Sequence, residues 1–295
     1  MSQLIGVHGI SQNYRWRQKI VDEWTSALTG GIEWAAGRRP AKAPDLDVAF
    51  YGHLFRSAAG ASEKGLADSQ EGAELAGLDD EELSDLTAAV QEIVSPDDLA
   101  DAEAGIGRDK ALMWLPIPLQ RLGGAIERRF PRSSGIVALS VLRQVRCYLR
   151  DAHTKAEIDQ ITAAAADGST VIIGHSLGSV VAYEYLRQNP ARPVKLLLTV
   201  GSPLGFRTVR RWLPAGEPGV ANWVNIRDPH DPVTAGGALG RWYPGVLDGL
   251  TDNGFDAHAA ERYLSCNRWK RAASTSRSSW PSAGRSSLVS DSALV

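Results

Sequence analysis

Short apolar segments rich in β-branched and aliphatic residues recur along the chain, and they predict β-strands. These segments are residues 3–7, 46–51, 170–173, 194–200, 221–226 and 245–250. Several are apolar almost throughout, as in strands of a parallel sheet that is covered on both faces, and do not alternate with polar residues. We therefore expect the strands to form the buried centre of the protein.

Helical patterns, with apolar residues three or four positions apart, separate these segments at 15–28, 155–166 and 179–188. Strands that alternate with helices predict a doubly wound α/β fold with a mostly parallel sheet of about six strands. A chain of 295 residues is long enough for one such domain with an insertion. We assign residues 1–55 and 150–270 to the α/β core.

Two segments lie outside this core. Residues 56–149 are first acidic, as in LDDEELSDL, and then apolar and basic, as in MWLPIPLQRLGGAIERRF. They are interpreted either as a helical cap over a site on the core or as a solvated, partly disordered insertion. We favour the cap because apolar residues of this segment need something to cover, namely Met113, Trp114, Leu115, Ile117 and Leu119. The serine-rich tail 271–295 lacks periodicity, which predicts disorder.

Composition and charge narrow the class of partner. The 32 basic and 34 acidic side chains nearly balance, which gives no reason to expect a nucleic-acid partner. Cys147 and Cys266, the only cysteines, rule out a disulfide-rich scaffold and a four-cysteine zinc site. No zinc-protease, phosphate-binding or dinucleotide motif is present, so we expect neither metal nor cofactor. A small molecule or a protein is left as the partner, and nothing indicates an oligomeric state.

The chain carries no sign of membrane insertion or export. No apolar run approaches the roughly 20 residues that span a bilayer. The first residues, MSQLIGVHGI, enter a strand pattern at once and leave no room for a signal peptide. We therefore expect no transmembrane segment and a cytoplasmic location.

The stretch VIIGHSLGSVVAYEYL, residues 171–186, places a serine between two glycines where a predicted strand meets a predicted helix. A serine hydroxyl is a poor nucleophile unless it is accessible and lies beside a base. In Gly-x-Ser-x-Gly the glycines, here Gly174 and Gly178, prevent collisions where the helix start crosses the strand end. A tight structural turn is the alternative, but the flanking strand and helix favour Ser176 as a nucleophile.

Candidate acids and bases follow later in the chain. The stretch NWVNIRDPHDPVT ends a predicted strand with Asp228 and Asp231. Either carboxylate could orient an imidazole and stabilise its protonated form, although Asp228 also fits a turn with the following proline. His230 lies between the two acids in the sequence, and side chains so close together on one loop rarely form a catalytic acid–base pair. His258 lies in a later loop before a final helical segment.

Several landmarks occur in a familiar order: VHGI at 7–10, GHSLG at 174–178, TVGSPL at 199–204, DPV at 231–233 and the late His258. With them the chain resembles an α/β-hydrolase of the lipase and esterase type over roughly 1–55 and 150–265. No predicted strand precedes VHGI, so the resemblance implies an α/β-hydrolase fold that lacks the first strands.

The resemblance also implies roles for individual residues. In this family the acid and then the base follow the serine, which favours His258, and the acid commonly stands in Asp-Pro-Val, which implies Asp231 with Asp228 as the alternative. By analogy, the backbone N–H groups of Ile10 and Leu177 form an oxyanion hole, each worth about 3 kcal/mol in comparable sites. The residues that support this arrangement are His8, Gly9, Gly174, His175 and Gly178.

The function predicted from these residues is a cofactor-independent serine hydrolase that cleaves a carboxylic ester or related acyl compound. The acyl-enzyme would form on Ser176, with His258 as base and Asp231 as the orienting acid. One alternative is a thioesterase or acyltransferase with the same three residues, because acceptor choice depends on the pocket. The other is a non-catalytic α/β-hydrolase scaffold that binds a protein or ligand, for which the acidic segment could be a docking surface.

Overall fold

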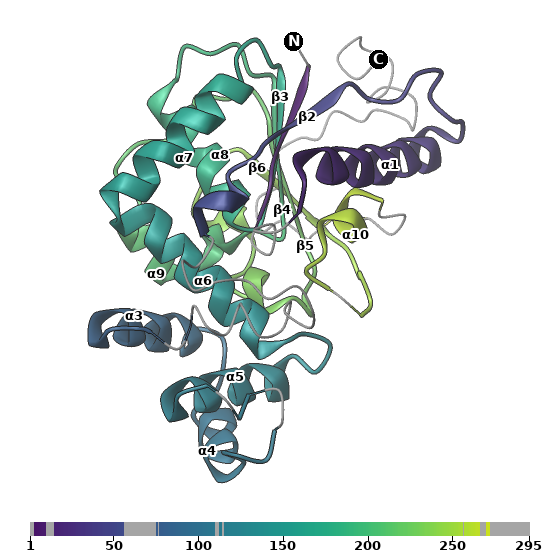
Figure 1. Cartoon of the computed structure of the whole chain (residues 1–295). Helices are drawn as coiled ribbons and strands as arrows, with labels where there is room; N and C mark the ends of the chain where they lie inside the picture. The colour runs from purple at the N-terminus through teal and green to yellow at the C-terminus, as the bar shows by residue number, and fades with distance from the viewer. Residues whose placement is uncertain are drawn as a thin grey trace.

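A parallel sheet organises the chain. The computed structural model describes residues 3–9, 15–55, 75, 77–109, 112–113, 115–255, 257–265 and 270–271. Within them a sheet with the order β2-β1-β3-β4-β5-β6-β7 is formed by β1 (Leu4–Val7), β2 (Leu46–Ala49), β3 (Val171–His175), β4 (Leu196–Val200), β5 (Trp223–Arg227), β6 (Val246–Leu250) and the short β7 (Lys270–Arg271). The first six strands are parallel and only β7 is antiparallel (Figure 1). The predicted α/β class and parallel sheet are confirmed.

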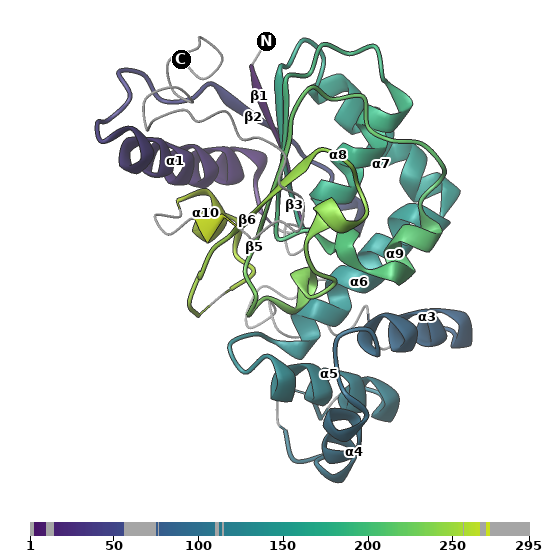
Figure 2. The same ribbon diagram turned by 180° about the vertical axis from the view of Figure 1, so that it is seen from behind.

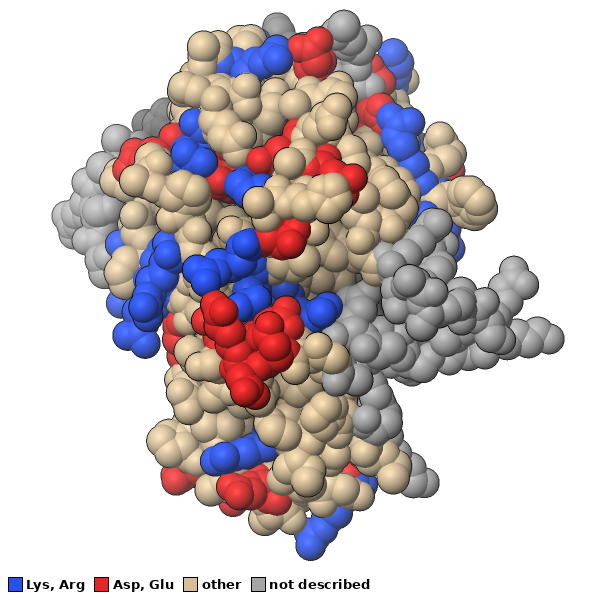
Figure 3. All heavy atoms as spheres, turned by 60° about the vertical axis from the view of Figure 1, so that its left-hand side comes forward, with Lys and Arg blue, Asp and Glu red and all other residues tan. Residues whose placement is uncertain are grey.

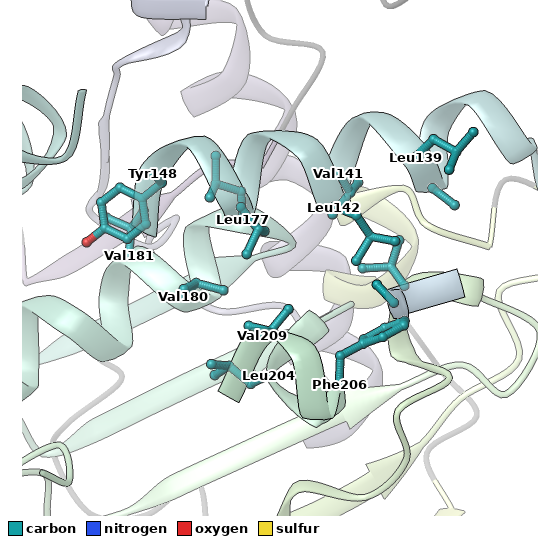
Figure 4. Packing of buried hydrophobic residues seen from close by; sticks show 14 of the residues in the cluster. Leu139, Val141, Leu142, Tyr148, Leu177, Val180, Val181, Leu204, Phe206 and Val209 are labelled. Atoms are coloured by element: carbon teal, nitrogen blue, oxygen red, sulfur yellow. The ribbon is translucent and has the colours of Figure 1, made fainter. Parts of the chain in front are cut away.

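Helices cover both faces of this sheet because successive strand residues point to opposite sides. One face is covered by α1 (Arg17–Ala36) and α10 (Ala260–Leu264), and the other by α6 (Gly135–Arg150), α7 (Ala152–Ala165), α8 (Leu177–Gln188) and α9 (Arg207–Trp212) (Figures 1 and 2). Leu4 packs with Trp24 of α1, whereas its neighbour Ile5 belongs to the core on the other face. Figure 4 shows this second core, where Leu142 of α6, Leu177 of α8 and Phe206 before α9 converge.

The order of the strands creates a natural site at one edge of the sheet. β1 and β3 are neighbours, yet the chain leaves β1 toward α1 on one face and leaves β3 toward α8 on the other. In α/β proteins, ligands bind where loops diverge in this way at the carboxyl ends of the strands. The residues that follow Val7 and His175 therefore occupy the most favourable position for a site.

Within the 56–149 segment, three helices lie beyond the carboxyl edge of the sheet. These are α3 (Asp80–Val90), α4 (Pro96–Ala104) and α5 (Ile117–Arg129) (Figure 1). The acidic stretches begin α3 and α4: Asp79 forms a capping box with Glu82, and Ser95 forms one with Asp98. Carboxylates in a first helical turn satisfy free N–H groups and interact favourably with the helix dipole. The last helix of the segment, α6, is buried in the α/β core.

The acidic face of α3 pairs with basic residues of α6. Arg146, whose side chain is 11% exposed, lies 2.6 Å from Asp85, 3.2 Å from Glu81 and 3.6 Å from Glu82. Figure 3 shows an acidic group lying directly against a basic group on the side where α3 meets α6. At the end of α3, the carboxylate of Glu92 accepts hydrogen bonds from backbone N–H groups in the first turn of α9. Several carboxylates of α3, and Glu92 after it, thus pair with groups of the same chain.

The apolar stretch at the start of α5 divides into buried and exposed residues. Leu115 and Leu119 are buried in the same core cluster as Leu122 and Ile126 of α5. Met113 and Ile117 remain 56% and 64% exposed. Trp114 lies outside the described residues, so its place in the predicted cap stays a prediction, as does the cap itself.

The structure also bears on the membrane segment, the two cysteines and the tail discussed above. Among the described residues, no helix combines the length and apolar character needed to cross a bilayer. Cys147 is partly buried, and burial raises the pKa of its thiol. Cys266 and the tail from residue 272 onward lie outside the described residues.

Helix α1 continues past its predicted end at residue 28 to Ala36 and includes two adjacent glycines, Gly30 and Gly31. A Cβ at Gly31 would lie 2.3 Å from the carbonyl oxygen of Leu264 in α10, whereas a Cβ at Gly30 would meet no atom within 4 Å. The helix ends at Gly37, whose φ of 67° favours glycine. Gly31 thus allows the close contact between α1 and α10.

These adjacent glycines give a matched test of the packing. Gly30→Ala should raise the free energy of unfolding by about 0.5–1 kcal/mol, because alanine restricts the unfolded chain and favours helix. Gly31→Ala should lower it by about 1–3 kcal/mol, because the added methyl must separate α1 from α10. Urea denaturation measures both values, and a stabilising effect of Gly31→Ala would contradict the close packing.

Candidate active site

Ser176 links the end of β3 to the start of α8 and has an unusual backbone conformation. Its backbone has φ 55° and ψ −126°, and among the described residues it is the only non-glycine residue with positive φ. Such a conformation costs on the order of 1–3 kcal/mol and persists only when its surroundings hold it. Here the Ser176 N–H donates to Val200, and the Ser176 carbonyl accepts from the backbone N–H and the hydroxyl of Ser179.

Three glycines allow the chain to close around Ser176. A Cβ at Gly178 would lie 1.9 Å from the carbonyl oxygen of Val7, and one at Gly174 would lie 2.6 Å from the Cα of Ser179. A Cβ at Gly9 would lie 2.7 Å from the Cβ of Ser176. Because the first two contacts meet backbone atoms, which cannot rotate away, the start of α8 can cross β1 only with glycine at position 178.

A continuous line of hydrogen bonds joins Ser176, His258 and Asp231. The Oγ of Ser176 lies 2.8 Å from Nε2 of His258, and Nδ1 of His258 lies 2.8 Å from Oδ2 of Asp231. Since a carboxylate only accepts, Nδ1 carries the imidazole proton and Nε2 presents its lone pair to the serine hydroxyl. Ser176 is fully buried, so it is not the accessible residue that the glycine-flanked turn predicts. Asp231 is fully buried as well, and the side chain of His258 is 13% exposed. The arrangement can pass the serine proton to an imidazole that a carboxylate orients.

The carboxylate of Asp231 is held by three hydrogen-bond donors. Oδ1 accepts from the backbone N–H of Val233, and Oδ2 accepts from His258 and from the hydroxyl of Tyr263 at 2.7 Å. Burial alone raises the pKa of Asp231, but the charge of His258 and the hydrogen bonds from His258, Tyr263 and Val233 outweigh burial and lower the pKa. Asp231 is therefore ionised at neutral pH.

Asp228 has a different position, although it is also fully buried. Its Oδ1 accepts from the backbone N–H of His230 and lies 3.1 Å from Nδ1 of His230, and its Oδ2 accepts from the backbone N–H of Asn253. These bonds tie the loop after β5 to the loop that carries His258. Of the two candidate acids, the structure brings Asp231 to His258, while Asp228 and His230 contact each other.

One group of potential metal ligands lies nearby among the described residues. Ligand atoms of Asp228, His230 and Asp252 lie within 4.8 Å of one another. Both carboxylate oxygens of Asp228 already accept hydrogen bonds, and Asp252 lies 3.2 Å from Arg132. Because groups of the protein occupy these oxygens, the cluster is explained as a structural network.

His8 and Gly9 follow β1 and lie close to the serine turn. Nδ1 of His8 donates to the Gly9 carbonyl, Nε2 accepts from the backbone N–H of Tyr51, and the His8 carbonyl accepts from the Tyr51 hydroxyl. Burial lowers the pKa of His8 to about 4, so the ring is neutral and both of its nitrogens have partners. His8 orients the turn and does not contact the serine hydroxyl.

The two predicted oxyanion donors differ in how they are placed. Leu177 is the first residue of α8, and N–H groups of a first helical turn have no acceptor within the helix. Such groups, together with the helix dipole, favour negative charge. Ile10 lies outside the described residues, so its part in an oxyanion hole stays a prediction.

His175 contacts both the backbone and the ring of His258. Its Nε2 lies 2.7 Å from the backbone carbonyl of His258, and the centres of the two rings are 4.8 Å apart. Burial first, and then the charge of His258, lower the pKa of His175 to about 3. The neutral ring donates to the His258 carbonyl and so holds the backbone of His258.

Sequence reasoning missed Tyr263 and Tyr51 as parts of this site. Both are fully buried and direct their hydroxyls to site residues, Tyr263 to Asp231 and Tyr51 to His8. A buried tyrosine usually finds a partner for its hydroxyl. The apolar spacing of Ala260, Tyr263 and Leu264 could have marked Tyr263 as buried, but nothing local indicates which acceptor it reaches.

The helical segment beyond the sheet edge is linked to both loops of the site. Between α5 and α6, the hydroxyl of Ser133 donates to the carbonyl of His230. The neighbouring Arg132 lies 3.2 Å from Asp252 in the loop that carries His258. These contacts tie the segment to the loops that carry Asp231 and His258.

Comparisons with known proteins do not add to this geometry. No family model, curated protein or solved structure matches the chain. Any conclusion about function must therefore come from the arrangement of the residues.

The two buried neutral histidines predict how stability depends on pH. Burial lowers the pKa of His8 from 6.5 to about 4 and that of His175 to about 3, so below pH 6.5 the unfolded chain binds more protons than the folded protein. The stabilising contribution of these groups is complete above pH 6.5 and is lost as the pH falls toward 4. Each histidine should contribute a slope of about 1.4 kcal/mol per pH unit. Urea denaturation from pH 7 to 4 measures the loss, and a constant free energy of unfolding would contradict it.

Proposed function

We propose that this protein is a serine hydrolase with an α/β-hydrolase fold, which cleaves a carboxylic ester or related acyl compound through an acyl-enzyme on Ser176. The line of hydrogen bonds from Oγ of Ser176 through His258 to Asp231, 2.8 Å at each step, carries this proposal. A strained serine alone fits a structural turn, and a histidine–aspartate pair alone fits a buried ion pair. Together they supply a nucleophile, a base and a group that orients the base.

In the acylation step, Oγ of Ser176 attacks the substrate carbonyl carbon while its proton moves to Nε2 of His258. The new Oγ–C bond converts the carbonyl oxygen to an oxyanion, which the N–H of Leu177 at the start of α8 can meet. The ionised carboxylate of Asp231 stabilises the imidazolium without taking its proton. The bond from carbon to the leaving oxygen then breaks, His258 gives its proton to that oxygen, and an alcohol leaves.

Deacylation repeats the same steps with water. His258 takes a proton from water as the water oxygen attacks the acyl carbon, and the bond between that carbon and Oγ breaks. The proton returns to Oγ of Ser176, and a carboxylic acid leaves. Every proton in this cycle is held by a group of the chain, the substrate or water.

The fold gives this proposal further support. The serine follows β3 beside the end of β1, where the chain leaves toward opposite faces of the sheet. The acid follows β5 and the base follows β6, so the order along the chain is serine, acid and histidine, as in the family that the sequence resembles. A small acyl substrate, the absence of a cofactor and a cytoplasmic location stay predictions.

A fluorophosphonate, which reacts with activated serines, tests the nucleophile. We expect one adduct on the wild-type protein and none on Ser176→Ala, as measured by intact mass. Ser169→Ala is the matched control, since Ser169 is also buried but donates only to Ala166 and should leave the adduct unchanged. Labelling of Ser176→Ala, or no labelling of a folded wild type, would overturn the proposal and favour a binding scaffold.

The two buried acids give a second test. Asp231→Asn should lower kcat by about four orders of magnitude, because an amide no longer enforces the imidazole tautomer that accepts the serine proton. Asp228→Asn should have a smaller effect, because among the described residues the carboxylate of Asp228 bonds to His230 and to the backbone of Asn253 and not to His258. Acyl esters of graded chain length measure kcat, with thermal unfolding as the control for folding. A larger loss in Asp228→Asn would contradict the assignment of the acid.

A further inference from the structure

We infer that Tyr263 is a positioning residue of this site, which holds the carboxylate of Asp231 and limits how strongly that carboxylate binds the imidazole of His258. The inference rests on the proposed function, because it assigns a task to a residue that touches neither the substrate nor the serine. Three features of Tyr263 lead to it: the direction of its hydroxyl proton, the oxygen that it shares with His258, and its location on α10.

The direction of the hydroxyl proton is settled by its two partners. The hydroxyl of Tyr263 lies 2.7 Å from Oδ2 of Asp231, and the backbone N–H of Asp228 donates to the same hydroxyl at 3.2 Å. A backbone N–H can only donate, so the single phenolic proton must point to the carboxylate. Burial, and then the negative charge of Asp231, raise the pKa of Tyr263 well above its ordinary value. Tyr263 is therefore a neutral donor at any pH at which the protein works.

Tyr263 and His258 donate to the same oxygen atom. Oδ2 of Asp231 accepts from Nδ1 of His258 at 2.8 Å and from Tyr263 at 2.7 Å. A hydrogen bond to a carboxylate stabilises its charged form, so a second donor reduces the charge available to the first. Without the phenol, the carboxylate would attract a protonated His258 more strongly. We conclude that the phenol moderates the pairing between acid and base.

The location of Tyr263 couples the acid to the base. Its ring is buried between Val200 of β4 and Ile226 of β5, while its backbone belongs to α10, which follows the loop of His258. Its hydroxyl also contacts both ends of the Asp228–Asp231 turn. One side chain thus fixes the acid loop relative to the segment that carries the base.

The alternative is that Tyr263 only fills the core. Phenylalanine at this position keeps the ring and its packing and removes only the hydroxyl, so Tyr263→Phe separates the two roles. Tyr185→Phe is the matched control: Tyr185 is buried as well, but among the described residues its hydroxyl has no hydrogen-bond partner.

The experiment measures kcat, KM and the pH dependence of kcat/KM for ester hydrolysis by the full chain. In Tyr263→Phe the acid limb should move upward by about half a pH unit or more, because the carboxylate of Asp231 loses one of its donors and pairs more strongly with the imidazole. kcat should fall on the order of tenfold with little change in KM, because Asp231 loses a restraint on its geometry. Tyr185→Phe should match the wild type in all three measurements.

A second variant should shift the acid limb in the opposite direction. It keeps the test valid if Tyr263→Phe folds poorly. Tyr263→3-fluorotyrosine keeps the size of the side chain but makes the phenol more acidic and thus a stronger donor. The acid limb should then move downward, a change that loss of packing would not produce.

The outcomes distinguish failure of the proposed hydrolase function from failure of the positioning role of Tyr263. A wild-type protein that neither hydrolyses esters nor reacts with a fluorophosphonate overturns the proposed function and this inference with it. An active wild type whose acid limb is unchanged in both variants overturns the inference alone, even if Tyr263→Phe is less stable. Opposite shifts of the acid limb in the two variants establish the positioning role.

Discussion

The close crossing of α8 over the end of β1 is the contact on which the site depends. The first turn of α8 approaches so closely that a Cβ at Gly178 would lie 1.9 Å from the carbonyl oxygen of Val7. At this crossing Ser176 has a positive φ of 55°, and the N-terminus of the helix lies beside His8 and Gly9. The packing of α8 into the core holds the strained turn, which local preferences alone would disfavour. The strained backbone of Ser176 and the positive end of the α8 dipole thus lie together beside the hydroxyl proposed as the nucleophile.

Around this point the site consists of buried polar groups whose partners come from separate parts of the chain. Asp231 keeps its charge inside the protein because Val233, His258 and Tyr263 donate to it. His175 is neutral, donates to the backbone of His258 and adds no competing charge. A buried polar group without a partner would cost on the order of 1–3 kcal/mol, so each of these bonds also restricts where the loops can lie. The same network therefore stabilises the fold and aligns the line of hydrogen bonds.

The helical segment beyond the sheet is joined to the core by charge as well as by apolar contact. Arg146 of α6 pairs with the acidic face of α3, and Glu92 at the end of α3 caps α9. Isolated surface ion pairs contribute little, but Arg146 is mostly buried and contacts three carboxylates. Ser133 and Arg132 extend the connection to the loops of the acid and the base. One interpretation of the sequence assigned the acidic stretch to a docking surface, but several of its described carboxylates pair with groups of the chain.

The sequence by itself determined the features that depend on neighbours along the chain. Apolar runs and helical periodicity predicted the six parallel strands and the helices α1, α7 and α8, because burial on both faces leaves a local pattern. GHSLG likewise marked the turn at Ser176, since its glycines serve contacts within a few residues or with one adjacent strand. Only the tertiary structure placed Asp231 and not Asp228 against His258, paired α3 with α6 and directed Tyr263 to Asp231. Hydrogen bonds and ion pairs between distant segments depend on how the loops meet in space, and composition and spacing carry no record of that geometry.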